Sequence, residues 1–239
     1  MRYSEIIPYG TLSTPPFERS LILKPADGLN IDYKAIVRGG YDLCVDTYSR
    51  ARKKTTGHDL DLLVTRFSGG EEVLDIGCGS GVPFTVALAK NFSVTGVDTS
   101  VEMIHLARKN LPDAEIIHSD IMTIKFDEDS FDAVTAFYSI FHLPRDEQRE
   151  LFRRIFRWLR PGGYLFCTLS YSGEEAYTES DFFGVTMYWS NHSLKEYMEI
   201  LDDVGFNLLV SAELSHGYVG RHGLPAERHP IILAQRPHC

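Results

Sequence analysis

This sequence has fewer basic residues than acidic ones. Its 239 residues include 24 lysines and arginines against 33 acidic residues, a formal net charge of −9. That balance argues against broad electrostatic binding to nucleic acid or to anionic membranes. The two basic stretches, Arg50–Lys54 and Arg153–Arg160, have helical spacing and are typical of solvated helix faces.

Cysteine and long apolar runs are also sparse. The four cysteines, at positions 44, 78, 167 and 239, lack the spacing of metal ligands, so we expect no metal site. No run approaches the roughly 18 apolar residues of a membrane-spanning helix, and the N-terminal segment has no apolar signal core. We therefore expect a cytoplasmic protein without a membrane partner. We also expect it to be a monomer or a homodimer.

The pattern along the chain predicts a small N-terminal part and one larger domain. Residues 1–57 read as an irregular arm followed by lid helices, with the helical pattern of 31–54 broken at Gly39–Gly40. Residues 58–239 read as the core domain. Within it, 171–192 reads as a long, substrate-facing insertion between a strand and a helix.

From Glu72 onward, apolar runs that predict strands alternate with amphipathic stretches that predict helices. Strands are expected at 72–77, 93–98, 114–120, 131–140, 164–170, 206–214 and 229–236, and helices at 82–91, 100–111, 145–159 and 193–204. Short strand–helix connections predict a doubly wound, mostly parallel α/β sheet. No helix connects the last two strands, so one of them, the final strand, is expected to be antiparallel.

The stretch EVLDIGCGSGVP, Glu72 to Pro83, places three glycines directly after the first predicted strand. Ligands of open α/β sheets bind beyond the carboxyl ends of the strands, where glycine permits positive φ and close backbone approach. No lysine follows Gly81, which excludes a P-loop. Val82 stands where a dinucleotide-binding loop requires its third glycine.

Two acidic residues narrow the choice of ligand further. Asp75 lies inside the first strand and would be a poor neighbour for a pyrophosphate. Asp98 ends the second strand, where a carboxylate can accept hydrogen bonds from the two hydroxyls of a ribose. The pattern therefore predicts a ribose-bearing ligand that carries positive charge.

Four ordered stretches carry a family resemblance: EVLDIGCGSG, VTGVDTS, HSDIMTIKFDEDSFDAVTAFYSIFHL and LFRRIFRWLRPGGYLF. In this order and spacing, over about Glu72 to Ser170, the sequence resembles class I S-adenosylmethionine (SAM)-dependent methyltransferases. It is most similar to the small-molecule enzymes of the ubiquinone and menaquinone biosynthesis type. The resemblance implies a Rossmann-like methyltransferase fold, SAM as cofactor and a small-molecule methyl acceptor.

The resemblance also implies roles for individual residues. The loop of Gly77, Cys78, Gly79 and Gly81 would pass under the methionine part of SAM, with Asp75 beside its ammonium group. The adenosine part would be bound by Asp98 at the ribose, by Thr99 and Met103 near the adenine, by Asp120 at the adenine amino group and by Ile121 on the ring. Tyr41 and Tyr48 resemble tyrosines that close over the cofactor.

Methyl transfer from a sulfonium is an in-line displacement, so alignment of the acceptor matters more than a general base. His142, at the end of a predicted strand, is the best-placed candidate base, with Tyr138 as a second catalytic candidate and His118 and His192 behind them. The insertion is rich in aromatic residues that could wall an acceptor pocket: Tyr171, Tyr177, Phe182, Phe183, Tyr188 and Trp189.

Other functions remain open at this point. A nicotinamide-dependent oxidoreductase could use a similar sheet, although the glycine spacing and Asp75 oppose it. A SAM-binding protein without catalysis, and a methyltransferase acting on RNA or protein, are the remaining alternatives. The acidic charge disfavours the RNA reading.

Overall fold

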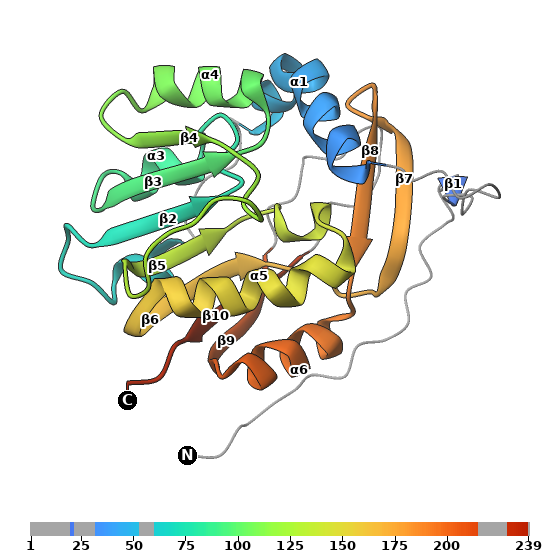
Figure 1. Cartoon of the computed structure of the whole chain (residues 1–239). Helices are drawn as coiled ribbons and strands as arrows, with labels where there is room; N and C mark the ends of the chain where they lie inside the picture. Colours follow the sequence, from blue (N-terminus) through green and yellow to red (C-terminus); the bar gives the residue numbers. More distant parts are fainter. Residues whose placement is uncertain (1–19, 22–31, 53–59, 215–228, 239) are drawn as a thin grey trace.

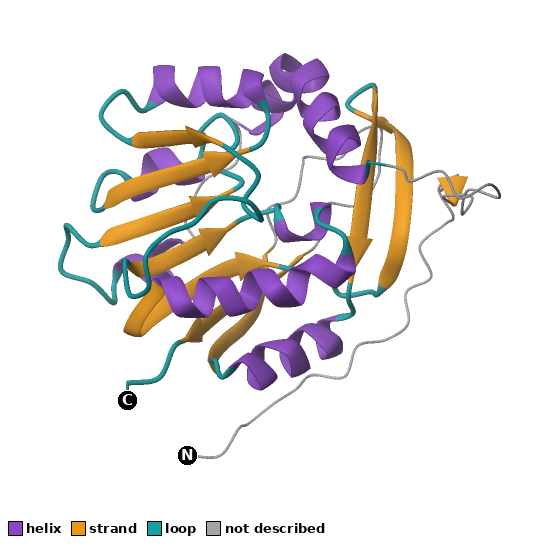
Figure 2. Cartoon of the chain, viewed as in Figure 1, coloured by secondary structure: helices purple, strands orange, loops and turns teal. Residues whose placement is uncertain are grey.

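The computed structural model describes residues 20–21, 32–52, 60–214 and 229–238. Their centre is a seven-stranded sheet in the order β4-β3-β2-β5-β6-β10-β9 (Figures 1 and 2). In chain order its strands are β2 (Glu72–Ile76), β3 (Ser93–Asp98), β4 (Glu115–His118), β5 (Phe131–Ala136), β6 (Leu159–Thr168), β9 (Asn207–Leu214) and β10 (His229–Gln235).

The strand pairing confirms the predicted fold class. Strands β4, β3, β2, β5 and β6 run parallel to one another, whereas β10 runs antiparallel to both of its neighbours, β6 and β9. The order runs from β2 through β3 to β4 on one side and from β5 to β6 on the other. The strand order therefore reverses between the paired strands β2 and β5, and their carboxyl ends form the switch point at which such sheets bind ligands.

Helices cover the sheet where the amphipathic pattern predicts them. They are α2 (Asp61–Val64), α3 (Phe84–Leu88), α4 (Val101–Asn110), α5 (Arg145–Trp158) and α6 (Leu194–Val204). Ser100, which the sequence suggests as the N-cap of this helix, accepts a hydrogen bond from the Met103 amide at the start of α4. Ser193 and Glu196 form a capping box on α6, which ends at Gly205 in a left-handed conformation. The sequence also predicts a short amphipathic helix over 58–67 with Asp59 or His58 as its cap, but these two residues lie outside the described part of the chain.

The predicted break at Gly39–Gly40 is wrong. Tyr33–Arg52 is one continuous helix, α1. Gly40 is needed for packing, because a Cβ there would lie 2.9 Å from the Met187 Cε atom and 3.1 Å from the Thr186 carbonyl oxygen. Contact with a distant strand therefore outweighs the low helix propensity of glycine.

The insertion 171–192 is not the long loop that the sequence suggested. It forms an antiparallel hairpin of β7 (Glu174–Phe182) and β8 (Val185–Asn191), and β1 (Ser20–Leu21) pairs with β7. The two-residue turn has φ of 52° at Phe183 and 85° at Gly184, as a type I′ hairpin turn requires. This three-stranded sheet stands beside the main sheet, and α1 packs against β8 (Figure 1).

The segment after β5 also differs from the prediction. The expected strand 131–140 ends at Ala136, and Tyr138 has a positive φ of 57°. Ile140–His142 is a single turn of 3-10 helix, η2. His142 therefore lies in a turn beyond the sheet and not at the end of a strand.

Candidate functional site

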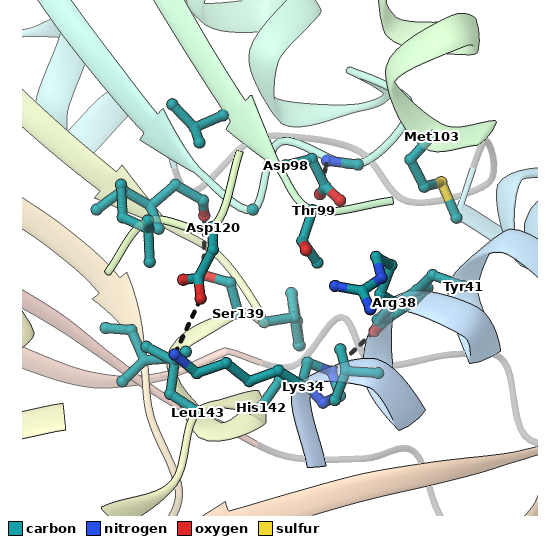
Figure 3. A pocket seen from close by; sticks show the side chains of 18 of the residues that line it. Lys34, Arg38, Tyr41, Asp98, Thr99, Met103, Asp120, Ser139, His142 and Leu143 are labelled. Carbon is teal, nitrogen blue, oxygen red and sulfur yellow. Dashed lines mark hydrogen bonds and ion pairs between the residues drawn. The ribbon is translucent and has the colours of Figure 1, made fainter. Parts of the chain in front are cut away.

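A cavity lies at the switch point, between the carboxyl ends of β2 to β5 and the helix α1 (Figure 3). It measures about 890 Å³, counting the part that opens to solvent. Its apolar lining consists of Val37, Ile76, Val97, Met103, Ile121, Phe137, Ile140, Leu143 and Leu151. The polar groups converge on this lining from both the sheet edge and α1.

The glycine loop forms the floor of the cavity. Gly77, Gly79 and Gly81 all have positive φ, which other residues rarely adopt. A Cβ on Gly77 would lie 2.4 Å from the Ser139 Cβ atom, so only glycine fits there. A Cβ on Gly79 would meet no atom within 4 Å, because this backbone faces the open cavity. The loop can therefore approach a ligand closely.

Asp98 lines the cavity beside this loop. Its two carboxylate oxygens accept hydrogen bonds from the Gly79 amide at 2.8 Å and from the Ser100 amide at 2.9 Å. Each oxygen retains lone pairs for a ligand. Burial raises the pKa of Asp98 above its ordinary value, while the backbone hydrogen bonds lower it. Two cis hydroxyls of a ribose match this arrangement of acceptors.

Asp120 follows β4 and faces α1. Its Oδ1 accepts from the Met122 amide at 2.8 Å, and its Oδ2 accepts from Lys34 Nζ at 2.9 Å. Lys34 also pairs with Glu147 Oε2 at 2.5 Å. Burial acts to lower the pKa of Lys34, but the hydrogen bonds to Glu147 and Asp120 outweigh it and raise that pKa.

His142 is buried and has a defined partner at each ring nitrogen. Nδ1 lies 2.8 Å from the Tyr188 carbonyl oxygen, and Nε2 lies 2.8 Å from the Tyr41 hydroxyl. A carbonyl oxygen only accepts, so Nδ1 carries the proton in neutral His142. Nε2 is then the acceptor of the Tyr41 hydroxyl. Both side chains line the cavity (Figure 3).

The structure brings together most of the site residues that the sequence predicted. The cavity is lined by Tyr41, Tyr48, Gly77, Gly79, Asp98, Thr99, Met103, Asp120, Ile121, Tyr138 and His142. Asp75 in β2, and Cys78 and Gly81 in the glycine loop itself, are not among the lining residues. Asp75 is 2% exposed, and its carboxylate accepts hydrogen bonds from Thr85 at 2.6 Å and Thr135 at 2.7 Å.

The other histidine candidates and the aromatic residues of the hairpin do not line the cavity. His118 bonds to the Thr99 carbonyl oxygen at 2.9 Å, and His192 contacts Arg145. The aromatic residues of the segment 171–192 are not among the residues that line the cavity: Tyr171, Tyr177, Phe182, Phe183, Tyr188 and Trp189. Several of them support the wall from behind. The Trp189 ring centroid, for example, lies 4.3 Å from that of His142.

Sequence reasoning missed two basic lining residues, Lys34 and Arg38, which extend from α1 into the cavity (Figure 3). The signal was present, because Lys34, Tyr41 and Tyr48 recur every seven residues and Arg38 is one turn from Lys34. Such spacing places them on one helix face.

The solvated-face reading of Arg50–Lys54 is wrong for Arg52. That side chain is buried, its Nε donates to the Tyr48 hydroxyl at 3.1 Å, and its Cζ lies 4.0 Å from the Tyr138 ring centroid. The two tyrosine rings give the guanidinium a favourable buried environment.

The geometry thus defines a doubly wound α/β protein with a cavity at its switch point. The helix α1, with Tyr41 and Tyr48, covers this cavity. Residues 73–163 match the family described as "Methyltransferase domain". Over these residues the chain is similar to class I SAM-dependent methyltransferases, in agreement with the fold and with the relatives below, and S-adenosylmethionine is the cofactor that this similarity indicates.

Two sequence relatives and one solved structure illustrate the similarity. A phosphoethanolamine N-methyltransferase of Triticum aestivum is 28% identical over 60% of this chain and 30% of its own length. A demethylmenaquinone methyltransferase of Listeria welshimeri is 32% identical over 43% of this chain and 46% of its own. The chain thus spans less than half the length of either relative.

The structural neighbour is the magnesium protoporphyrin IX methyltransferase of Synechocystis with bound SAM. It superposes with a TM-score of 0.65 at 17% identity, covering 87% of this chain and 99% of the neighbour. This likeness concerns the fold. Within the part of the chain that the structure describes, we find no helix with the length and apolar character needed to cross a membrane.

Proposed function

We propose that the protein transfers the methyl group of SAM to a small-molecule oxygen, nitrogen or carbon nucleophile. The observation that carries this proposal is the convergence of the open glycine loop, Asp98 and Asp120 on one cavity at the switch point. The methyltransferases similar to this chain act, by their names, on phosphoethanolamine, demethylmenaquinone and magnesium protoporphyrin IX. A small acceptor and a cytoplasmic location are part of the proposal.

The cavity offers a suitable group for each part of the cofactor. Gly77 and Gly79 would underlie the methionine part, and Asp98 would accept from the ribose hydroxyls. Asp120 would accept from the adenine amino group, with Ile121 against the ring. Thr99 and Met103 lie on the adjoining wall. Asp75 does not line the cavity, and its carboxylate already accepts hydrogen bonds from two threonine hydroxyls. It would therefore act on the ammonium group through its charge and not by direct contact.

SAM supplies an activated methyl group, so the protein must align the acceptor and exclude water. Effective alignment is worth about 7–11 kcal/mol of the barrier. The α1 helix serves this purpose in our proposal, because it covers the cavity with Val37, Tyr41 and Tyr48. Lys34, on the same helix, forms ion pairs with both Asp120 and Glu147.

The His142–Tyr41 pair would remove the proton of the acceptor. As the acceptor bonds to the methyl carbon, its proton would pass to the Tyr41 oxygen while the Tyr41 proton passes to Nε2 of His142. The imidazolium so formed would still donate from Nδ1 to the Tyr188 carbonyl oxygen. Such general-base assistance is worth about 10²–10⁴-fold in rate.

Two measurements on the purified protein test the proposal. We expect SAM and S-adenosylhomocysteine to bind by calorimetric titration, with no comparable affinity for NAD. We then expect labelled methyl groups to appear on an acceptor when SAM is incubated with pooled hydroxyl, amine and carbon-acid compounds. A higher affinity for NAD than for SAM would overturn the assignment of SAM as the cofactor. SAM binding without transfer to any small molecule, RNA or protein would favour the binding-only alternative.

A further inference from the structure

Gln148 on α5 is a completely buried polar residue, with an exposed fraction of 0%. Its Nε2 donates to two carbonyl oxygens, that of Leu143 at 2.7 Å and that of Ser190 at 2.8 Å. Its Oε1 accepts from the Tyr197 hydroxyl at 2.8 Å. A buried amide is tolerated only when its hydrogen bonds are made, and here both N–H groups and the oxygen have partners.

The partners of Gln148 place it next to the proposed base without contact with the cavity. Leu143 directly follows His142, whereas Ser190 lies two residues beyond Tyr188 on β8. Carbonyl groups two residues apart point the same way along a strand. The bond from Gln148 to Ser190 therefore runs beside the bond from His142 Nδ1 to Tyr188.

These parallel bonds join the turn η2 to the edge of β8. Among the described strands, β8 pairs with β7 on one edge only. On its other edge, the Tyr188 and Ser190 carbonyl oxygens accept from His142 and Gln148. Other contacts also hold η2 near β8, namely the ring contact of His142 with Trp189 at 4.3 Å and the bond from the Arg145 amide to the Ser190 hydroxyl at 3.2 Å. The Gln148 amide is the contact that ties the backbone just after His142 to the carbonyl group beside that of Tyr188.

The orientation of this amide is fixed by chemistry. A flipped amide would place Oε1 against two carbonyl oxygens that can only accept, leaving three buried oxygens without a donor. The donor end of Gln148 must therefore face Leu143 and Ser190, while Oε1 faces Tyr197.

We propose that Gln148 is a positioning residue that holds His142 against the Tyr188 carbonyl group. It thereby keeps His142 in the tautomer with the proton on Nδ1 and Nε2 directed at Tyr41. The inference rests on the proposed function insofar as His142 acts as the base. The structural part, control of the His142 tautomer, can be measured in the ligand-free protein.

The test removes the donors of Gln148 with little change of shape. In Gln148→Met, we expect kcat to fall about 10- to 100-fold, because small misplacements of a reacting group have costs of this size, with Kd for SAM within about twofold. Nitrogen-detected NMR of the ligand-free protein should show the Nδ1–H tautomer of His142 in the parent and a mixture of tautomers in the variant. Introduced into His142→Ala, the same substitution should lower kcat no further.

Tyr197→Phe is the matched control, since it removes the third hydrogen bond of Gln148 and leaves both bonds from Nε2. We expect it to lower the melting temperature but to retain kcat and the His142 tautomer. If Gln148→Met does not fold, Gln148→Met combined with Tyr197→Phe is the second variant, because it leaves no buried Tyr197 hydroxyl without its acceptor.

The possible outcomes separate this inference from the proposed function. An unchanged tautomer in the folded Gln148 variant would overturn the inference, as would an equal loss of kcat in the His142→Ala background. A tautomer change in a protein that methylates no acceptor would support the positioning role and refute the proposed function.

Discussion

The sheet edge and the cap contribute to the same cavity in different ways. At the sheet edge, strand direction alone places three residues together: Gly77 just after β2, Asp98 as the last residue of β3 and Asp120 in the loop after β4. The cap combines α1 and the hairpin, which are separated by more than a hundred residues of chain. Parallel strands end together whatever their side chains, whereas the cap depends on packing between distant segments.

Aromatic packing holds the cap together. Tyr33 stacks on Tyr188 with ring centroids 4.5 Å apart, and Tyr41 meets Phe182 edge-on at 5.9 Å. Such pairs contribute about 0.5–1.5 kcal/mol each beyond their burial. The hairpin aromatics thus position the tyrosines that line the cavity, although they do not line it themselves.

Polar bonds then join the cap to three parts of the core. Lys34 reaches Asp120 and Glu147, Tyr41 reaches His142, and Asp42 accepts from the Ser100 hydroxyl at 2.6 Å and the Glu102 amide at 3.1 Å. The last contact adds a carboxylate at the N-terminus of α4, which the helix dipole favours. Docking of α1 is therefore coupled to the geometry of the cofactor side of the site.

The largest effect is expected where cap and core meet, at His142. We expect His142→Ala to lower turnover by up to about 10⁴-fold, because the acceptor proton would lose its recipient. His142→Asn should be similarly impaired, since an amide keeps hydrogen bonding but cannot take up the proton. Turnover is measured by single-acceptor kinetics at saturating SAM. Full activity of the asparagine variant would show that alignment alone carries the reaction.

A second effect concerns the core alone, at Asp75. Burial raises the pKa of Asp75 from 3.8 to about 6, against hydrogen bonds from Thr85 and Thr135 that lower it. The folded state holds this proton more tightly than the unfolded chain. Its contribution to stability is therefore full below pH 4 and lost as pH rises through 6, which amounts to about 3 kcal/mol.

Asp75→Asn cannot ionise and should lose this pH dependence. Relative to the parent, its free energy of unfolding by urea should therefore rise by about 3 kcal/mol between pH 4 and pH 8. Glu128→Gln, at an exposed position, is the control and should show no such rise. Identical pH profiles for Asp75→Asn and the parent would mean that the fold does not raise the pKa of Asp75.

The cofactor side of the core is tested at Asp98. We expect Asp98→Ala to weaken SAM binding by about 2 kcal/mol, because ribose donors would lose a charged acceptor. Calorimetry measures the affinity. A melting curve separates this loss from disturbance of the Gly79 and Ser100 amides that Asp98 holds. Asp113→Ala, an exposed acid, should bind normally. Parent-like affinity in Asp98→Ala would remove Asp98 as the ribose ligand.

The smallest effect isolates the cap and uses two adjacent glycines of α1. Gly39→Ala should stabilise the protein by about 0.5–1 kcal/mol, since its Cβ meets no atom within 4 Å and alanine favours the helix. Gly40→Ala should lack this gain, because its Cβ would press on Met187 and the Thr186 carbonyl group. Urea unfolding compares them. Equal stabilisation by both substitutions would show that α1 does not dock closely on β8.

Sequence reasoning succeeded where structure follows from local chemistry. The alternation of strands and helices, the antiparallel β10 and the Ser100 cap were predictable because periodicity and capping are encoded within a few residues. It was less successful for the hairpin. The Phe183-Gly184 turn carried a recognisable signal, but the aromatic residues around it indicated only an acceptor wall.

The sequence by itself determined the sheet, the switch point and the residues at the carboxyl ends of the parallel strands. Because these strands run in one direction, Gly77, Asp98 and Asp120 lie at the same edge of the sheet. Only the tertiary structure decided what faces them. The bond between Tyr41 and His142, the pairing of Lys34 with Asp120 and the bond between Gln148 and Ser190 each join residues at least 40 positions apart. Such contacts depend on how α1 and β8 pack over the core, and no local pattern in the chain specifies that packing.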